Sequence, residues 1–142
     1  MSAALRLRSR PLGSVRKTGL SLEVVLIYVQ ARWMLPRLEL KEVLRRLRQP
    51  TRFVTPLPRG LTADEQGIKL GRAVVRTLAL APTDTRCLVR SVVLSALLAR
   101  RSIPSTLVVG VKTDPHFRAH AWVEGESRDL LSREGYSTLV RI

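Results

Sequence analysis

One cysteine and two histidines are the side chains best suited to nucleophilic chemistry in this 142-residue chain. Cys87 lies in the stretch TDTRCLVRS, and His120 lies 33 residues further along in FRAHAWVEG. A thiol attacks a carbonyl carbon well only as the thiolate, which a helix N-terminus or a nearby imidazole favours. The pair is therefore a candidate nucleophile and base. The alternative is a buried cysteine that packs as a small apolar residue, which is common.

The segment that carries Cys87 is predicted to be a buried helix. Thr83 is a suitable N-cap, and residues 88–99 are apolar on nearly all sides. Cys87 then lies in the first turn, where unpaired backbone N–H groups favour negative charge. We interpret Ser91 and Ser95 on the same helix as small packing residues.

After this helix the pattern changes to the two-residue period of strands. Residues 105–112 are short and β-branched, and in residues 117–124 small or apolar positions alternate with the positions of Arg118, His120, Trp122 and Glu124. A turn at 125–127, a returning strand at 128–131 and a last strand at 136–142 are expected to complete a small antiparallel sheet.

Three helices are predicted before the Cys87 helix, over residues 20–35, 38–49 and 62–80. Thr62 and Glu65 have the spacing of a capping box at the start of the third. Helices first and a small sheet last is an α+β fold. We divide the chain into a flexible basic arm (1–18), a basic helical segment (19–60) and an α+β core (61–142).

Asp129 is the candidate for an acid that orients His120. A two-residue turn at 125–126 pairs Trp122 with Asp129, so that Asp129 shares the face of His120 and lies on its diagonal, within side-chain reach. Glu134 is the reserve candidate. The alternative is that Asp129 is an ordinary charge beside a turn.

Other constellations are weaker. His116 and His120 are four residues apart, but the alternation indicates a strand, where such residues are far apart. Cys87, His120 and an acid lack the ligand density of usual zinc motifs, and no Gly-rich phosphate loop occurs. We expect neither a metal nor a cofactor.

The formal net charge of +14 is concentrated in the first part of the chain, where residues 1–60 hold 13 Lys/Arg and 3 Asp/Glu. Such a surface attracts anions of any class. Few aromatic residues (4%) argue against single-strand nucleic-acid binding by stacking. The single cysteine, the absence of a signal-peptide pattern and the shortness of the longest apolar run predict a cytoplasmic protein without a membrane span.

The stretches CLVRSVVLSALLARRSIPSTLVVGV and FRAHAWVE resemble the leader peptidase of lasso-peptide biosynthesis, over about residues 70–142. This family is a transglutaminase-like, papain-like cysteine protease found alone or as the C-terminal part of the larger B protein. The resemblance implies Cys87 as nucleophile, His120 as general base and Asp129 as the acid that orients it.

The resemblance also implies the substrate and partners. The enzyme would cleave the leader from a ribosomally made precursor peptide, and an ATP-dependent cyclase would act on the freed core peptide. A leader-recognition protein would bind in trans, with the basic segment 19–60 as a docking surface, and no nucleic acid is expected.

Two other classes of function stay open. One is a transglutaminase-like hydrolase or acyltransferase for another substrate, which would use the same residues. The other is a non-enzymatic basic module that binds RNA or an acidic protein, in which Cys87 is structural.

Overall fold

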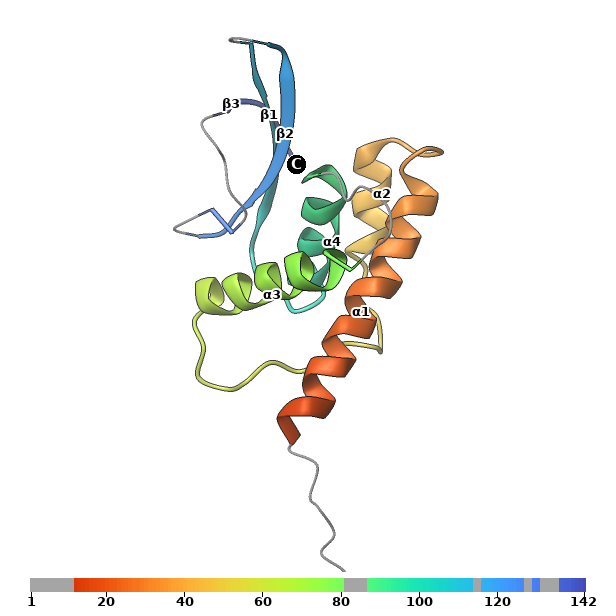
Figure 1. Ribbon diagram of the computed structural model, residues 1–142, viewed down its shortest axis with the longest axis vertical. Coiled ribbons are helices and arrows are strands. Elements are labelled where there is room, and N and C mark those ends of the chain that lie inside the picture. The colour runs from red at the N-terminus through yellow and green to blue at the C-terminus, as the bar shows by residue number, and fades with distance from the viewer. Residues whose placement is uncertain (1–11, 81–86, 114–115, 127–128, 131–135) are drawn as a thin grey trace, which may run out of the picture.

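The computed structural model of the chain describes residues 12–80, 87–113, 116–126, 129–130 and 136–142. Helices come first and strands last, which confirms the α+β prediction (Figure 1). The elements in chain order are α1 (Leu12–Met34), α2 (Leu40–Leu47), α3 (Ala63–Leu78), α4 (Cys87–Ala99), β1 (Thr106–Lys112), β2 (Arg118–Glu124) and β3 (Ser137–Arg141).

Helix α1 begins earlier than the sequence pattern indicates. It starts at Leu12 instead of Leu20, and so includes residues 12–18, which we had assigned to a flexible arm. Arg16 and Lys17 in these first turns are exposed, so this part carries no apolar period for a pattern to detect. Residues 1–11 lie outside the described part of the chain. No helix in the described ranges is long and apolar enough to cross a membrane.

The third helix begins as predicted, with a capping box. The Thr62 hydroxyl accepts the N–H of Glu65 at 3.2 Å, and the Glu65 carboxylate accepts the N–H of Thr62 at 2.8 Å. Both interactions satisfy N–H groups that a helix start otherwise leaves unpaired.

Helix α4 is the centre of the core. Its residues 91–98 are all buried, and it packs against the other three helices and against β1 and β2. Buried side chains of α1 and α2 share this core with those of α3, α4 and the sheet, so residues on both sides of position 60 contribute to it. A helix enclosed in this way is held rigidly, which fixes the position of its first residue, Cys87.

The sheet has the strand order β2-β1-β3, with both neighbouring pairs antiparallel. Leu107 and Val123 face the helices and belong to the main core. Val108, Trp122 and Tyr136 form a second, small cluster on the opposite face. The sheet therefore has a helix-covered face and an aromatic face, and β2 forms one of its edges.

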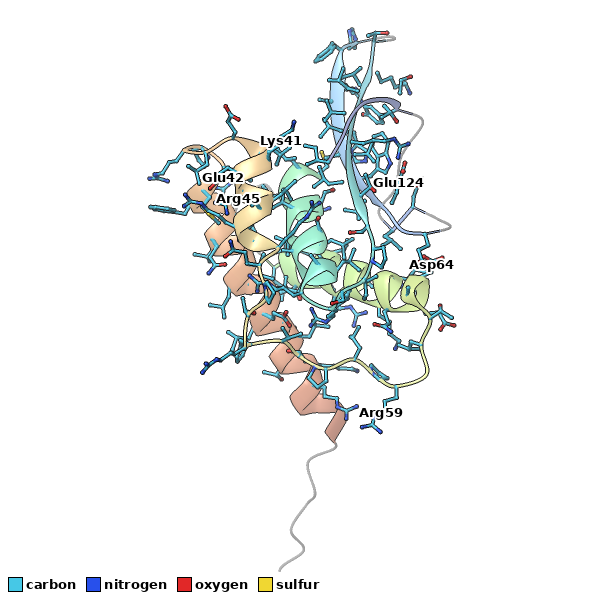
Figure 2. The ribbon with its side chains drawn as sticks, turned by 180° about the vertical axis from the view of Figure 1, so that it is seen from behind. Lys41, Glu42, Arg45, Arg59, Asp64 and Glu124 are labelled. Atoms are coloured by element: carbon cyan, nitrogen blue, oxygen red, sulfur yellow. The ribbon has the colours of Figure 1, made fainter. Side chains whose placement is uncertain are left out.

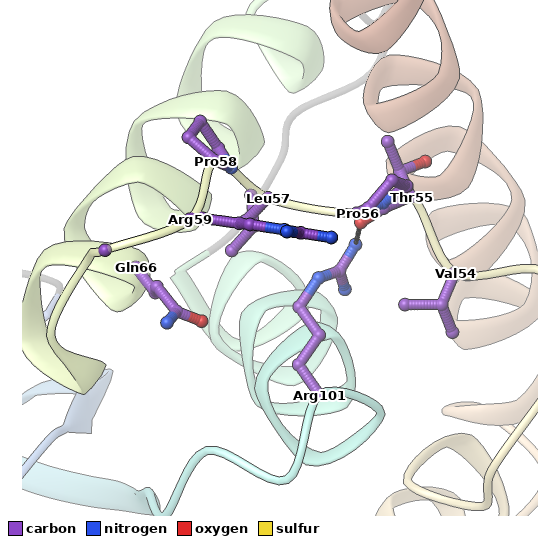
Figure 3. A pocket seen from close by; sticks show the side chains of 9 residues that line it. Val54, Thr55, Pro56, Leu57, Pro58, Arg59, Gln66 and Arg101 are labelled. Atoms are coloured by element: carbon purple, nitrogen blue, oxygen red, sulfur yellow. Dashed lines mark hydrogen bonds between the residues drawn. The ribbon is translucent and has the colours of Figure 1, made fainter.

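A buried ion pair joins the ends of distant elements. Arg101, just after α4, donates to both carboxylate oxygens of Glu23 in α1, at 3.1 and 2.7 Å, and to the carbonyl of Thr55 at 2.8 Å. The Thr55 N–H in turn donates to Glu23 at 3.0 Å. Figure 3 shows Arg101 reaching from α4 to the loop at Thr55 and Pro56. These contacts fix the proline-rich loop at residues 50–60 against α1 and the end of α4.

Candidate active site

The first turn of α4 lies against the outer edge of β2. Cys87 and Ser91 are one helical turn apart, and both contact the backbone of Ala121. The Ala121 N–H donates to Cys87 Sγ at 3.4 Å, and the Ser91 hydroxyl donates to the Ala121 carbonyl at 3.0 Å. Ala121 pairs with Val109 in the sheet, so the two side chains of α4 satisfy the backbone groups of Ala121 that point away from β1.

The structure places the Cys87 sulfur beside the backbone of His120. Ala121 N is bonded to the carbonyl carbon of His120, so the His120 Cα lies within about 6 Å of Cys87 Sγ. Both side chains are half-buried. The predicted helix is present from Cys87 to Ala99, and its proposed cap, Thr83, lies outside the described residues.

The imidazole of His120 lies among aromatic rings on the far face of the sheet. Its ring centroid is 5.0 Å from that of Tyr136 and 6.1 Å from that of Trp122. Tyr136 and Trp122 are both buried. Two large, fixed rings limit the orientations available to the imidazole.

Gly110 makes room for this arrangement. It is the direct partner of His120 on β1, and a Cβ atom built there would lie 2.6 Å from atoms of the Trp122 indole and from the Ser137 carbonyl oxygen. The indole can therefore lie close over the backbone of β1 only because position 110 has no side chain.

Glu124 fixes the other side of the Trp122 ring. The indole Nε1–H donates to the Glu124 carboxylate at 3.2 Å, and the same carboxylate forms an ion pair with Arg141 of β3. Figure 2 shows Glu124 beside the sheet. A chain of contacts thus runs from Arg141 through Glu124 and Trp122 to His120.

The predicted hairpin after β2 is wrong in its register. Glu124, and not Trp122, pairs with Asp129, and the Leu130 N–H donates to the Val123 carbonyl at 2.7 Å. The predicted register would place Leu130 opposite Ala121, whose outward N–H and C=O are already bonded to Cys87 and Ser91. Helix α4 therefore excludes a returning strand from this part of the edge.

Leu130 fixes the observed register from the other side. It is buried, and its side chain lies so close to Gly67 of α3 that a Cβ atom at this glycine would be 2.7 Å from it. The short stretch at Asp129 and Leu130 is thus held between the end of β2 and α3.

This register places Asp129 away from His120. Directly paired residues share a face, so Asp129 shares the face of Glu124 and His120 as predicted. However, His120 and Glu124 are four residues apart, about 13 Å along a strand. Asp129 is exposed, and its role as the orienting acid stays a prediction. Glu134, the reserve candidate, lies outside the described residues.

The sequence interpretation missed the residues that surround the cysteine and histidine. Ser91 was assigned to packing, yet its spacing of four from Cys87 on one helix face was a signal that both meet the same partner. Trp122 and Glu124 lie two and four residues after His120 on the same strand, and so their side chains are on the same face of the sheet as that of His120. Tyr136 comes from a distant segment, and no local pattern indicated it.

No three His, Cys, Asp or Glu side chains converge on a potential metal site within the described ranges. The arrangement at Cys87 and His120 contains the groups for nucleophilic attack and proton transfer: a thiol at a helix start that accepts an N–H, and an imidazole on the adjoining strand residue.

A family model described as transglutaminase-like superfamily matches residues 25–140. The chain belongs to the transglutaminase-like superfamily. Members of this superfamily are commonly cysteine proteases or acyltransferases. The matched residues of the transglutaminase-like chain include Cys87 and His120 together with the second part of α1, from Val25 on. No match was found among curated proteins or solved structures.

Proposed function

We propose that this transglutaminase-like protein is a cysteine peptidase that removes the leader from a ribosomally made lasso precursor peptide. The observation that carries the catalytic part is the contact of Cys87 Sγ with the Ala121 N–H, beside His120. The choice of substrate comes from the resemblance of residues 70–142 to the lasso leader peptidases.

In the proposed reaction, the Cys87 thiolate attacks the carbonyl carbon of the scissile amide. The carbonyl electrons move to oxygen, and the tetrahedral intermediate collapses as the C–N bond breaks. The imidazolium of His120 gives its proton to the leaving amine, which becomes the new amino terminus of the core peptide. The leader stays attached to Cys87 as a thioester.

Water completes the turnover. His120, now neutral, accepts a proton from a water molecule that attacks the thioester carbonyl. The C–S bond then breaks, the leader leaves as a carboxylic acid, and Cys87 returns as the thiolate beside the imidazolium.

Two backbone N–H groups support this chemistry. The N–H of Ala121 stabilises negative charge on Cys87 Sγ through its hydrogen bond. We assign the N–H of Cys87, the first described residue of α4, to the developing oxyanion, because N–H groups in the first turn of a helix have no partner within the helix. Asp129→Ala tests the predicted role of Asp129 as the orienting acid.

Cleavage of the precursor in the presence of its recognition protein tests this proposal. Cys87→Ala is expected to abolish cleavage, and His120→Ala to slow it by about 10²–10⁴-fold, with unchanged circular dichroism. Lys112→Ala, an exposed position at the far end of β1, is the matched control and should cleave normally. Cleavage by Cys87→Ala at the wild-type rate would contradict the proposal.

The same assay separates a peptidase from an acyltransferase. With hydroxylamine present, mass spectrometry identifies the new end of the leader as an acid or as a hydroxamate. A peptidase forms the acid from water when no amine is added. If the leader is released only as the hydroxamate, and only when hydroxylamine is supplied, the chain is an acyltransferase.

A further inference from the structure

A groove between α1 and α3 has a basic section along its first part. Arg16 and Lys17 of α1 and Lys69, Arg72 and Arg76 of α3 line this section, whose volume is about 570 Å³. All five side chains are exposed, and the three on α3 recur at the spacing of one helix face. No acidic residue is among the described residues that line it.

The groove continues into an apolar section. Arg76 lines both sections, and the second, of about 520 Å³, is lined mainly by Val25, Tyr28 and Val29 of α1 and by Leu78 and Leu80. Leu80 is a large hydrophobic residue, and it is 87% exposed. The surface therefore offers positive charge at one end and apolar contact at the other.

An exposed apolar stripe borders the groove on α1. Leu22, Leu26, Val29 and Trp33 follow one another at intervals of three or four residues, and each is about half exposed or more. Monomeric proteins rarely leave a contiguous stripe of large apolar side chains in water. The stripe and the groove together indicate a surface that another molecule covers.

We propose that the groove between α1 and α3 binds an acidic, amphipathic helical segment of a second protein. Carboxylates at one end of that segment would pair with Arg72, Arg76 and Lys69, and apolar side chains at its other end would fill the section around Val29 and Leu80. From Arg16 to Val29 the α1 side of the groove is about 20 Å long, which suits a helix of three to four turns.

Charge and shape argue against other occupants. The first ten residues of this chain carry Arg6, Arg8 and Arg10 and no acid, and a second copy would bring another chain of net charge +14. Tyr28 is the only aromatic residue among the described lining residues, which gives a nucleic acid little to stack on. A lipid surface cannot enter a hollow of this kind.

This inference goes beyond the proposed function and does not depend on catalysis by Cys87. Leu80, at the apolar end of the groove, is seven residues before Cys87 in the sequence. None of the residues that line the groove comes from the sheet. A partner bound in the groove would therefore not need to contact the sheet.

Fluorescence anisotropy with a synthetic peptide tests the proposal. The probe has about 18 residues, with several Glu at one end and a Leu stripe at helical spacing at the other; a peptide with Lys in place of Glu is the control. The expected result is saturable binding of the Glu peptide only. Arg72→Glu/Arg76→Glu should weaken it at least about tenfold, as should Val29→Asp.

Lys112→Glu/Arg118→Glu is the matched variant, because it changes the net charge equally at exposed sites on the far end of the sheet. It should keep wild-type affinity for the Glu peptide. Equal weakening by both double variants would show a non-specific charge effect and overturn the proposal. Tighter, Arg72- and Arg76-dependent binding of poly(U) RNA or of phosphatidylserine vesicles would overturn it as well.

Discussion

The residue-scale feature on which the account depends is the contact of α4 with the backbone of Ala121. Cys87 and Ser91 occupy the N–H and the C=O of one strand residue, and the preceding residue is His120. Because helix α4 is buried on nearly all sides, the Cys87 sulfur is held against the strand residue that follows His120. Residue type and the buried helix were enough to predict Cys87 and His120 as a candidate pair. The contacts of Cys87 and Ser91 with the backbone of Ala121 could not be predicted from the sequence.

Removal of the Ser91 hydroxyl is expected to loosen this contact. Ser91→Ala leaves the Ala121 carbonyl, which the hydroxyl now satisfies, without that donor in a buried site, which costs about 1–3 kcal/mol of unfolding free energy. Urea denaturation measures this cost. Alkylation of Cys87 should slow in the same variant, whereas Ser102→Ala, at an exposed residue after α4, should change neither quantity.

The third member of the site shows where prediction from sequence fails at this scale. The face of Asp129 was predicted correctly, because alternation along a strand is local. The residue that pairs with Asp129 was predicted wrongly. The register depends on the packing of Leu130 against Gly67 and on α4, which occupies the edge of β2 beside Ala121. Neither contact is visible in the residues of the hairpin.

At the scale of elements, local signals predicted the helices and strands well. The buried positions Val24, Ile27, Ala31 and Met34 of α1 follow the apolar period, and the capping box at Thr62 has a strong sequence signature. The first turns of α1 were missed because their described side chains face solvent. The joining of α1, α4 and the proline-rich loop by one ion pair could not be read from a sequence, since its partners are 78 residues apart.

Removal of the acid from that ion pair should destabilise the protein strongly. Glu23 and Arg101 have side chains only 1% and 7% exposed, so Glu23→Ala leaves a buried guanidinium without its carboxylate. The expected loss is about 3–5 kcal/mol of unfolding free energy. Thermal or urea unfolding measures it, and a loss no larger than that of the exposed Glu39→Ala would show that the pair is not a stabilising link.

The pH dependence of α2 is a smaller effect with a definite sign. Hydrogen bonds from Arg45 and Arg46 lower the pKa of Glu42 from 4.5 to about 2. A lowered carboxylate pKa adds stability that is present above pH 4.5 and is lost as the pH falls towards 2. The melting temperatures of wild type and Glu42→Gln should therefore differ at pH 6 and converge near pH 2. The difference at pH 6 should be small, because the Arg45–Glu42 pair is exposed.

At the scale of the whole molecule, two surfaces have different composition and different places in the fold. The candidate active site lies where α4 meets the edge of β2, and the groove lies between α1 and α3. Composition showed that the first part of the chain is basic. It could not show that cations of α1 and α3, which are about fifty residues apart in sequence, line one groove.

The helices and the helix-covered face of the sheet share the main core, and this explains how the two surfaces are held in fixed positions relative to each other. Helix α4 contacts α1 and α3 on the side of the groove and β2 on the side of the cysteine. The family match over residues 25–140 includes Cys87 and His120, but the superfamily contains both proteases and acyltransferases, so membership does not by itself distinguish a peptidase from a transferase.

Reactivity of Cys87 towards iodoacetamide at pH 6 tests the central claim most directly. An ordinary thiol reacts slowly at this pH, because little of it is thiolate. We predict fast alkylation of the wild type, measured by mass spectrometry, that is lost in His120→Ala while the fold is retained. Asp129→Ala, measured alongside, reports whether that acid contributes. Slow labelling of Cys87 in every folded variant, with fast labelling only after unfolding, would contradict the account and make Cys87 a packing residue.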